Sequence, residues 1–361
     1  MEKKINKKKL SLLIFGIIVV VVVICMLIFK FVLVDDKIKD DNEQSKKVGE
    51  VKEVKKESIT IDFVGDITMG NYKGASYYGS FDNEFENQGQ NYGYFLKNVK
   101  NIFEEDDLTV ANLEGPLTSE SNAKIKKFAF KGDPSYVNIL NQGGIDAVTL
   151  ANNHSEDYFE EGMKQTKFIL KENNIDYFGL GEKSIVDVKG VKVGLLGYNG
   201  WPENYNEEFL NNMKKDIQSV KKESNIVFVY FHWGTERQYY PDQVQKDFAH
   251  FAIDNGVDGV LGSHPHVMQG IEEYKGKYIA YSLSNFCFGG NKNPQDKDTF
   301  IYKQTFNFED SKLISINKPE IIPCSISSQN GINNYQPTPL TGNEAERVKN
   351  KLKDISEGLN K

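Results

Sequence analysis

The stretch VDGVLGSHPH at residues 257–266 shows the pattern that decides the fold, because a short apolar run ends directly in side chains that bind metals. This run ends in His264 and His266, and the stretch NIVFVYFHWG at 225–234 ends in the same way at His232. Short apolar, β-branched runs are typical of buried strands. In open α/β sheets, ligands bind beyond the carboxyl ends of the strands. The pattern therefore predicts that these histidines meet at one edge of a sheet.

Three earlier runs end in the same manner. ITIDFVGD ends at Asp66, LTVANLE ends at Glu114, and IDAVTLANNH ends at Asn152, Asn153 and His154. Imidazole, carboxylate and carboxamide donors without thiolates suit zinc, manganese or iron. Two such cations a few ångströms apart need a bridging carboxylate to offset their repulsion, and either Asp66 or Glu114 can occupy that place. The five run ends together predict a centre for two divalent metal ions (Mn, Zn or Fe).

Around these runs, strand-like stretches alternate with amphipathic stretches, which predicts an α/β (α+β) fold. The expected strands of this part are 59–65, 107–112, 145–151, 191–198, 225–231, 257–262 and 277–284. The expected helices are 134–142, 159–172, 206–222 and 241–255. After Lys277 the pattern changes to successive strands, at 299–308, 311–317 and 319–325, which predicts a second sheet region packed on the first. A polar, peripheral helix is expected at 343–358.

The N-terminal part of the chain indicates a membrane anchor. Residues 10–34 are apolar apart from Lys30, and about 20 apolar residues span a bilayer as a helix. Five lysines precede this run, so the positive-inside rule predicts a cytoplasmic tail at 1–9 and an extracellular C-terminal part. A cleaved signal peptide is the alternative, but the run ends without a site of small residues for cleavage. We expect a single-pass protein of the cell membrane, held in the lipid bilayer by residues 10–34.

The remaining chain divides into three parts by composition. Residues 35–58 are polar and mixed in charge, which indicates a solvated linker or a short exposed helix. A globular domain is expected at 59–330 and a C-terminal extension at 331–361. Residues 1–34 carry six lysines and one glutamate within a total charge of −7, so the outer part carries −12. This acidic balance argues against nucleic acid as a partner.

The motifs themselves resemble a known family. GDITMG, NLEGPLT, LANNHSEDY, FHWGTE, GSHPH and YSLSNF resemble, in this order, the motifs of the CapA family of poly-γ-glutamate synthesis proteins, also called the PgsA family. The resemblance covers about residues 59–326. It implies the calcineurin-like metallophosphatase fold, which is a β-sandwich flanked by helices with a dinuclear metal site.

The resemblance also implies roles for single residues. Glu114 stands where an aspartate usually bridges the metals. Asp66 and His266 are implied as ligands of the first metal, and Asn153, His232 and His264 as ligands of the second. The superfamily usually has a histidine two residues after the first aspartate, and this chain has Thr68 there. The first metal would therefore have fewer protein donors.

Further residues near the motifs are expected to act on the substrate. The expected catalytic pair is His154, as a proton donor or as a cation facing an anionic substrate, and Asp157, which orients its ring or caps the following helix. Asn152, Trp233 and Asn285 are the expected substrate contacts, with core packing as the alternative for Trp233 and a structural turn for Asn285.

Other polar residues are expected to have structural roles. Glu236 and Arg237 follow the HWG turn as exposed loop charges, with substrate contact as the alternative. His250 lies on an amphipathic helix and is expected to be structural. Cys287 and Cys324 are too few for a disulfide framework, and their pairing is left open.

Three functions are compatible with these features. The first is synthesis, export or anchoring of poly-γ-glutamate, or of another anionic envelope polymer, with membrane polymer synthase components as partners. The second is a metal-dependent hydrolase of the cell envelope that acts on phosphoesters or amides. The third is a noncatalytic scaffold that binds polymer.

Overall fold

The computed structural model describes residues 20–26, 28 and 54–360 of the chain. The chain divides into two units, residues 1–54 and 55–361. In the first unit, residues 20–26 and 28 are helical. Within the described residues, no helix combines the length and the apolar character that crossing a bilayer requires. Most of the expected anchor at 10–34 lies outside the described residues, so the anchor stays a prediction.

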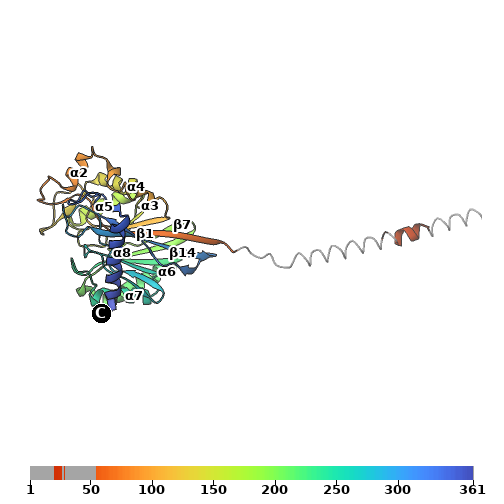
Figure 1. Cartoon of the computed structure of the whole chain (residues 1–361). Helices are drawn as coiled ribbons and strands as arrows, with labels where there is room; N and C mark the ends of the chain where they lie inside the picture. Colours follow the sequence, from red (N-terminus) through yellow and green to blue (C-terminus); the bar gives the residue numbers. More distant parts are fainter. Residues whose placement is uncertain (1–19, 27, 29–53, 361) are drawn as a thin grey trace, which may run out of the picture. The chain divides into compact units, whose positions relative to one another are not determined.

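The second unit is built on a nine-stranded sheet whose long central strand is β1 (Figure 1). The strands follow the order β17-β16-β14-β1-β3-β5-β6, with β13 beside β1 and β15 beside β14. Their bounds are β1 Lys56–Thr68, β3 Leu108–Leu113, β5 Ala147–Thr149, β6 Asp176–Phe178, β13 Asn285–Phe288, β14 Asp298–Glu309, β15 Lys312–Ile316, β16 Glu320–Ser325 and β17 Thr338–Pro339. The strands β1, β3, β5 and β6 run parallel, and β14 is antiparallel to β1.

A six-stranded sheet packs on one face of the first. Its order is β11-β12-β10-β9-β8-β7, and β8, β9, β10 and β12 are parallel. The bounds are β7 Ser184–Val188, β8 Val191–Gly200, β9 Ile226–Trp233, β10 Gly259–Ser263, β11 Ile271–Tyr274 and β12 Lys277–Ala280. A separate two-stranded sheet pairs β2 (Asn71–Tyr72) with β4 (Phe130–Lys131).

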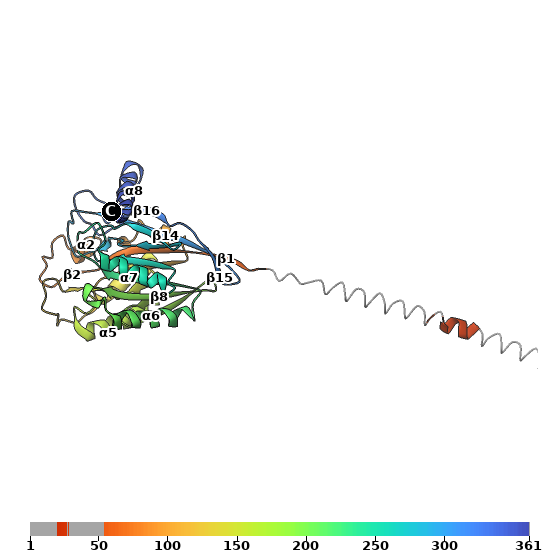
Figure 2. The ribbon, with the colours of Figure 1, turned by 90° about the horizontal axis from the view of Figure 1, so that it is seen from below.

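Helices cover the outer faces of the two sheets, as Figures 1 and 2 show. The helices are α2 Phe81–Asn87, α3 Lys100–Phe103, α4 Val137–Gly143, α5 Phe159–Glu172, α6 Glu207–Lys221, α7 Gln243–Asp254 and α8 Gly342–Glu357. Short 3₁₀ turns lie at Tyr92–Tyr94, Pro134–Tyr136, Pro202–Asn204 and Gly358–Asn360. α2, α4 and α5 pack on the large sheet, and α6 and α7 pack on the small one.

The alternation along β1 explains how the layers hold together. Ile61 and Phe63 point into the core between the two sheets, where Phe63 meets Phe228 of β9 with ring centroids 5.0 Å apart. Val64 and Ile67, near the end of the strand, belong to the core beneath the helices of the large sheet. Both faces of β1 are therefore buried, as expected for the central strand of a sandwich. The expected mixed α/β fold is confirmed.

The expected strand at 277–284 is confirmed only over Lys277–Ala280, because the chain then leaves one sheet for the other. β12 ends at Ala280 in the small sheet, and β13 begins at Asn285 in the large one. Ser284 takes a φ of 66° at this crossing, and its carbonyl accepts a hydrogen bond from the Asp66 backbone N–H at 3.0 Å. A Cβ on Gly65 would lie 1.8 Å from the Ser284 oxygen, so only glycine permits this approach. The apolar sequence at 277–284 gives no sign that the chain changes from one sheet to the other there.

The ends of the unit also differ from the expectation. β1 begins at Lys56, so residues 56–58, expected in the linker, pair with β14. The residues after 330, expected as an extension, lie in the same compact unit as the sheets. α8 buries Val348 and Leu352 against the core between the sheets. Cys287 and Cys324 are both buried free thiols.

An ion-pair network holds α8 to the start of β14. The Arg347 guanidinium donates to both oxygens of the Asp298 carboxylate at 2.7 and 2.8 Å, and the Lys351 ammonium donates to the same carboxylate at 2.8 Å. Burial raises the pKa of Asp298, but these two cations outweigh burial and hold the pKa below its ordinary value of 3.8. Glu344 is a second, exposed partner of Arg347 at 2.8 Å.

Replacing Asp298 by asparagine is expected to lower the free energy of unfolding by about 2 kcal/mol, because the buried carboxylate loses the charge that pairs with the half-exposed Arg347 and with Lys351. Glu344→Gln removes the exposed partner and should cost less than about 0.5 kcal/mol. Since the folded-state pKa of Asp298 is lowered, its contribution is complete above the ordinary value and is lost as the pH falls through the folded-state pKa. Chemical unfolding at neutral and acid pH measures this. Equal stability of both variants at neutral pH would show that the ion pairs of Asp298 do not stabilise the fold.

Candidate metal centre

The carboxyl ends of four strands meet at one edge of the sandwich. In the large sheet, Asp66 of β1 lies beside Asn112 of β3 and beside Asn285 of β13. In the small sheet, His232 of β9 lies beside Ser263, the last residue of β10. Glu114 follows β3, and His264 and His266 follow β10. The two packed sheets therefore deliver their polar ends to the same place.

Two groups of potential metal donors form there, and they share one residue. Glu114, His232 and His264 form the first group, and Asp66, Glu114 and His266 form the second. In each group the donor atoms lie within 4.8 Å of one another. Asn153 adds its Oδ1 to the first group, at 2.9 Å from His232 Nε2. The sheets thus bring together all six sequence-predicted ligands, with Glu114 at the junction.

Several buried atoms of this cluster make no hydrogen bond with the described residues, although Asp66 Oδ2 lies 3.3 Å from His266 Nδ1. Across residues 54–360, Asp66 Oδ2, Glu114 Oε1 and His264 Nδ1 are buried without a hydrogen bond. Buried polar atoms are nearly always satisfied, and a carboxylate left alone in this way is costly. Glu114 Oε1 lies 3.7 Å from His232 Nε2, which is a distance that leaves room for an ion between them. The donor set therefore fits divalent cations.

The electrostatics of the cluster favour metal-binding protonation states at two histidines. Burial, with the neighbouring imidazoles, lowers the pKa of His232 well below its ordinary range. Burial and His266 lower the pKa of His264 to about 4. Both rings are therefore neutral at pH 7, and a neutral imidazole is the form that binds a metal.

The two acidic residues and His266 complement each other. Burial and the charge of Asp66 raise the pKa of Glu114. Burial lowers the pKa of His266, but Glu114 and Asp66 outweigh it and raise the pKa to about 9. In the absence of a cation, a proton on His266 thus balances part of the negative charge of the two carboxylates.

The His-Pro-His segment holds an unusual backbone. His264 has a φ of 96° and His266 a φ of 56°, both in the region that favours glycine. Such strain persists only where the surroundings impose it, and it is frequent at functional sites. The Pro265 carbonyl accepts a hydrogen bond from the Arg237 backbone N–H at 2.7 Å, which ties this turn to the loop after β9.

A second polar cluster adjoins the centre. His154 Nδ1 lies 2.7 Å from Asp157 Oδ2, and the Lys126 ammonium donates to Asp157 Oδ1 at 2.6 Å. Asp157 also accepts from the Phe130 backbone N–H at 2.7 Å. Asp157 is thus fully engaged and fixes the His154 ring, as the sequence predicted. The alternative N-cap role is not seen, because α5 has no side-chain cap.

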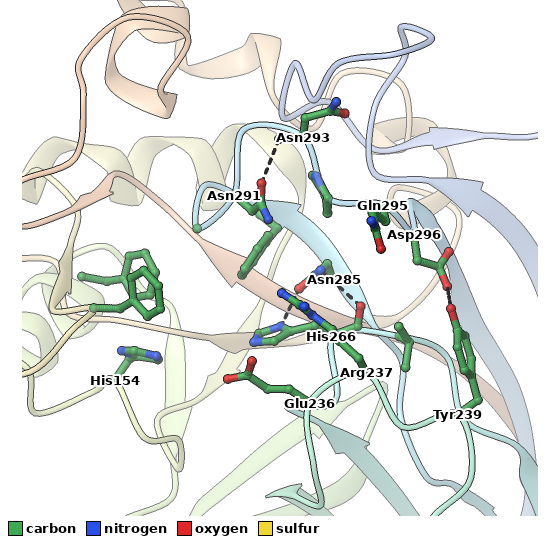
Figure 3. A pocket seen from close by; sticks show the side chains of 16 residues that line it. His154, Glu236, Arg237, Tyr239, His266, Asn285, Asn291, Asn293, Gln295 and Asp296 are labelled. Carbon is green, nitrogen blue, oxygen red and sulfur yellow. Dashed lines mark hydrogen bonds between the residues drawn. The ribbon is translucent and has the colours of Figure 1, made fainter.

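A cleft of about 480 Å³ opens beside the centre, and Figure 3 shows its lining. His154 lies on one side of the cleft, and His266 lies apart from it with Glu236 and Arg237 beside it. Phe128, Phe130 and Phe288 contribute aromatic walls, and Asn291, Asn293 and Gln295 contribute carboxamides from the loop after β13. The centre therefore has access to a pocket large enough for a ligand.

Comparison with known proteins identifies the family. Residues 60–290 match the bacterial capsule synthesis protein family PGA_cap. The chain belongs to this family. It is similar to the capsule biosynthesis protein CapA of Bacillus anthracis, with 28% identity over 88% of this chain and 78% of that protein. It is also similar to the PGA biosynthesis protein CapA of Bacillus subtilis, with 31% identity over 66% of this chain and 65% of that protein.

More distant similarities extend this result. A probable polyglutamine synthesis accessory protein of Mycobacterium tuberculosis is 24% identical over 61% of the chain and 66% of that protein. Among solved structures, the chain is similar to the NAD nucleotidase NadN of Haemophilus influenzae, with a TM-score of 0.40 and 12% identity over 83% of this chain. The chain spans 56% of that structure's length, which is little more than half.

Two of the expected substrate contacts of this PGA_cap protein lie away from the cleft. Asn152 donates to the Asn112 side chain and to the Leu113 carbonyl, and its Oδ1 accepts from His154 N–H. Asn152 therefore links the end of β3 to the backbone of His154. Trp233 is fully buried and donates to the Tyr281 carbonyl at 2.7 Å, so the core-packing alternative describes it.

The third expected contact, Asn285, does line the cleft. However, its Oδ1 accepts from His266 Nδ1 at 2.8 Å, so it orients the ring of a candidate metal ligand. A tryptophan does approach the centre, but it is Trp201, which follows β8. The half-buried Trp201 ring meets the His264 ring edge-on at 4.9 Å. Trp201 lies in none of the six sequence motifs quoted above.

Asn112 is the supporting residue that sequence reasoning missed. It is fully buried, its Nδ2 donates to Asp66 Oδ1 at 2.7 Å, and it lies 3.3 Å from His232 Nδ1. It therefore links the two sheets beneath both donor groups. Its signals in the sequence are an amide within an apolar strand and its place as the first residue of the NLEGPLT motif. Thr68 has a similar role, because its hydroxyl donates to Glu114 Oε2 at 2.9 Å.

Replacing Asn112 by leucine is expected to weaken metal binding by about 10–100-fold, because residues that orient metal ligands contribute to this extent. Competition with a coloured chelator at pH 7 measures the affinity. Asn138→Leu, at a half-buried asparagine of α4 that bonds only the Ser135 carbonyl, is the matched control and should leave the affinity unchanged. Equal affinities of the two variants would show that Asn112 does not position the donors.

Proposed function

We propose that this PGA_cap protein acts in the synthesis, export or anchoring of an anionic envelope polymer, in the first place poly-γ-glutamate, through a dinuclear metal centre. The observation that carries the proposal is the carboxylate of Glu114, which is shared by two donor groups beside a cleft. One carboxylate between two sets of donors is the arrangement that offsets the repulsion of two adjacent cations. Bound divalent ions, Mn, Zn or Fe, would supply Lewis-acid stabilisation of anionic oxygens.

The ligands divide in the following way. Asp66 and His266 would hold the first cation, and Asn153, His232 and His264 would hold the second, with Glu114 available to both. Thr68 contributes by orienting Glu114 rather than by replacing the missing histidine. Asn112, Asn152 and Asn285 keep the strand ends in register.

The names of the relatives support the polymer. Two Bacillus proteins with similar sequences are named for capsule and PGA biosynthesis, and the Mycobacterium protein for polyglutamine synthesis. The domain as a whole is acidic, so the polymer's carboxylates would meet the cations of the centre rather than a broad basic groove. We further propose that residues 10–34 anchor the chain in the cell membrane, with the C-terminal domain outside and the polymer synthase as a membrane partner.

Hydrolysis is the second candidate, and the contact between His154 and Asp157 favours it. The ring lies at the cleft beside the donor groups, and Asp157 holds its Nδ1. His154 Nε2 would therefore face a bound substrate and give a proton to a leaving oxygen or nitrogen. The substrate would be a phosphoester or an amide bond of a γ-linked chain.

The metal count tests the centre. The purified full-length chain, loaded with Mn²⁺ or Zn²⁺, is expected to hold two ions. Glu114→Gln should lose both, because it removes the common ligand, whereas His264→Ala should lose one. His250→Asn is the control and should retain both, since His250 of α7 pairs with Glu272 of β11 instead. Elemental analysis after gel filtration gives the count. Full metal content in Glu114→Gln would refute the dinuclear centre.

His154→Gln separates catalysis from binding. If the protein is a hydrolase, this variant keeps both metals but cleaves a generic phosphoester or a γ-glutamyl oligomer at least about 100-fold more slowly. If the protein binds polymer without cleaving it, neither chain shows turnover with any metal, while His232→Ala still abolishes surface polymer in cells. If His232→Ala remains folded and the amount of surface polymer is unchanged, the result would contradict both hydrolysis and polymer binding through the metal centre. The protein would then be a noncatalytic scaffold.

A further inference from the structure

The cleft contains two adjacent charged side chains that no described residue neutralises. Glu236 and Arg237 follow β9 in the FHWGTE motif, and both line the cleft together with His266. Figure 3 shows both side chains extending into the space beside His266. The turn is fixed, because Gly234 has a φ of 77° and the Arg237 backbone bonds to Pro265. The backbone therefore places these two exposed side chains in the cleft beside the candidate metal centre.

Arg237 is unusual in this chain. The protein has 44 basic residues, and only Arg237 and Arg347 are arginines. Arg347 forms a two-pronged pair with the Asp298 carboxylate, which is the geometry that a planar guanidinium favours. Between residues 54 and 360, the Arg237 side chain makes no such pair. An arginine at this place, in a chain that otherwise uses lysine, indicates a carboxylate-shaped ligand.

Glu236 carries the opposite charge, and it also lacks a partner among the described residues. The other acidic residue of the cleft, Asp296, is satisfied, because it accepts from Lys351 at 2.7 Å and from the Tyr239 hydroxyl at 2.8 Å. Glu236 makes no hydrogen bond or ion pair with any residue that the structure describes. A purely polyanionic ligand would be repelled by Glu236, whereas a ligand with an ammonium beside its carboxylate would satisfy both side chains.

We propose that Glu236 and Arg237 recognise the zwitterionic amino-terminal residue of a γ-linked glutamyl chain. Every residue of such a chain keeps a free α-carboxylate, but the α-nitrogen is acylated in all residues except the first. Only the first residue therefore carries an ammonium and a carboxylate on the same carbon. Glu236 binds the ammonium and Arg237 binds the α-carboxylate. The identity of the polymer in this inference rests on the function proposed above.

The rest of the cleft suits the links that follow. Asn291 Oδ1 accepts from the Asn293 N–H and Asn293 Oδ1 accepts from Lys297, so these side chains keep their amide N–H groups for the carbonyls of a γ-linked chain. Gln295 adds a third carboxamide. Phe128 and Phe130 form an apolar wall that lowers the local exposure to water and strengthens the charged contacts. The site thus binds the amino end of the chain and places the adjoining amide link near the metal donors.

Calorimetric titration of the full-length, Mn²⁺-loaded protein with two oligomers tests this inference. The oligomers are a γ-linked tetraglutamate with a free amino end and the same tetramer N-acetylated. Acetylation is expected to weaken binding at least about tenfold, since it removes one charge-assisted contact. Glu236→Gln should bind both oligomers equally, at the level of the acetylated one. Arg237→Gln should weaken both at least about tenfold.

Charge-matched variants on an exposed face of α6 serve as controls. Glu208→Gln and Lys214→Gln should retain the discrimination of the wild type. Equal binding of both oligomers by the wild type, or no effect of Arg237→Gln in a folded chain, would overturn the recognition of the chain end while leaving polymer binding intact. Binding of neither oligomer to the wild type would overturn this inference and also the proposed contact with poly-γ-glutamate.

Discussion

The centre depends on one buried carboxylate with an unequal environment. One oxygen of Glu114 accepts from Thr68, and the other has no hydrogen bond among the described residues. An anion in this position is unfavourable unless a positive charge compensates it. His266 and Asp66 lie on one side of it, and His232 and His264 lie on the other. The arrangement of the surrounding side chains therefore follows from the need to bring positive charge to this oxygen.

That need links the two sheets of the sandwich. Asp66 and Glu114 belong to the large sheet, and His232 and His264 belong to the small one. Asn112 crosses the boundary, because it contacts both Asp66 and His232. A cation bound by donors from both sheets would favour only the fully packed state, and its binding free energy would add to the stability of the fold.

The sequence located the donors well because the geometry of parallel strands is regular. Histidines and carboxylates at strand ends must lie at one edge of each sheet, so Asp66, His232 and His264 could be placed together without a structure. The supporting residues were not accessible in this way. Asn112 lies within a strand, where its partners depend on packing between sheets. Trp201, after β8, lies beside His264 in place of Trp233, because Trp233 directly follows His232 in β9 and points to the opposite face of the small sheet.

The position of β1 has a mechanical consequence. The strand has 13 residues, lies between β14 and β3, and begins at Lys56, directly where the chain joins the domain. Tension applied to the preceding residues would act along the strand axis and would load the hydrogen bonds of both ladders in shear. Bonds loaded in shear must break together, whereas bonds at a frayed edge open one after another. The domain is therefore built to resist pulling at its amino end, while the cleft lies at the opposite end of the same strand.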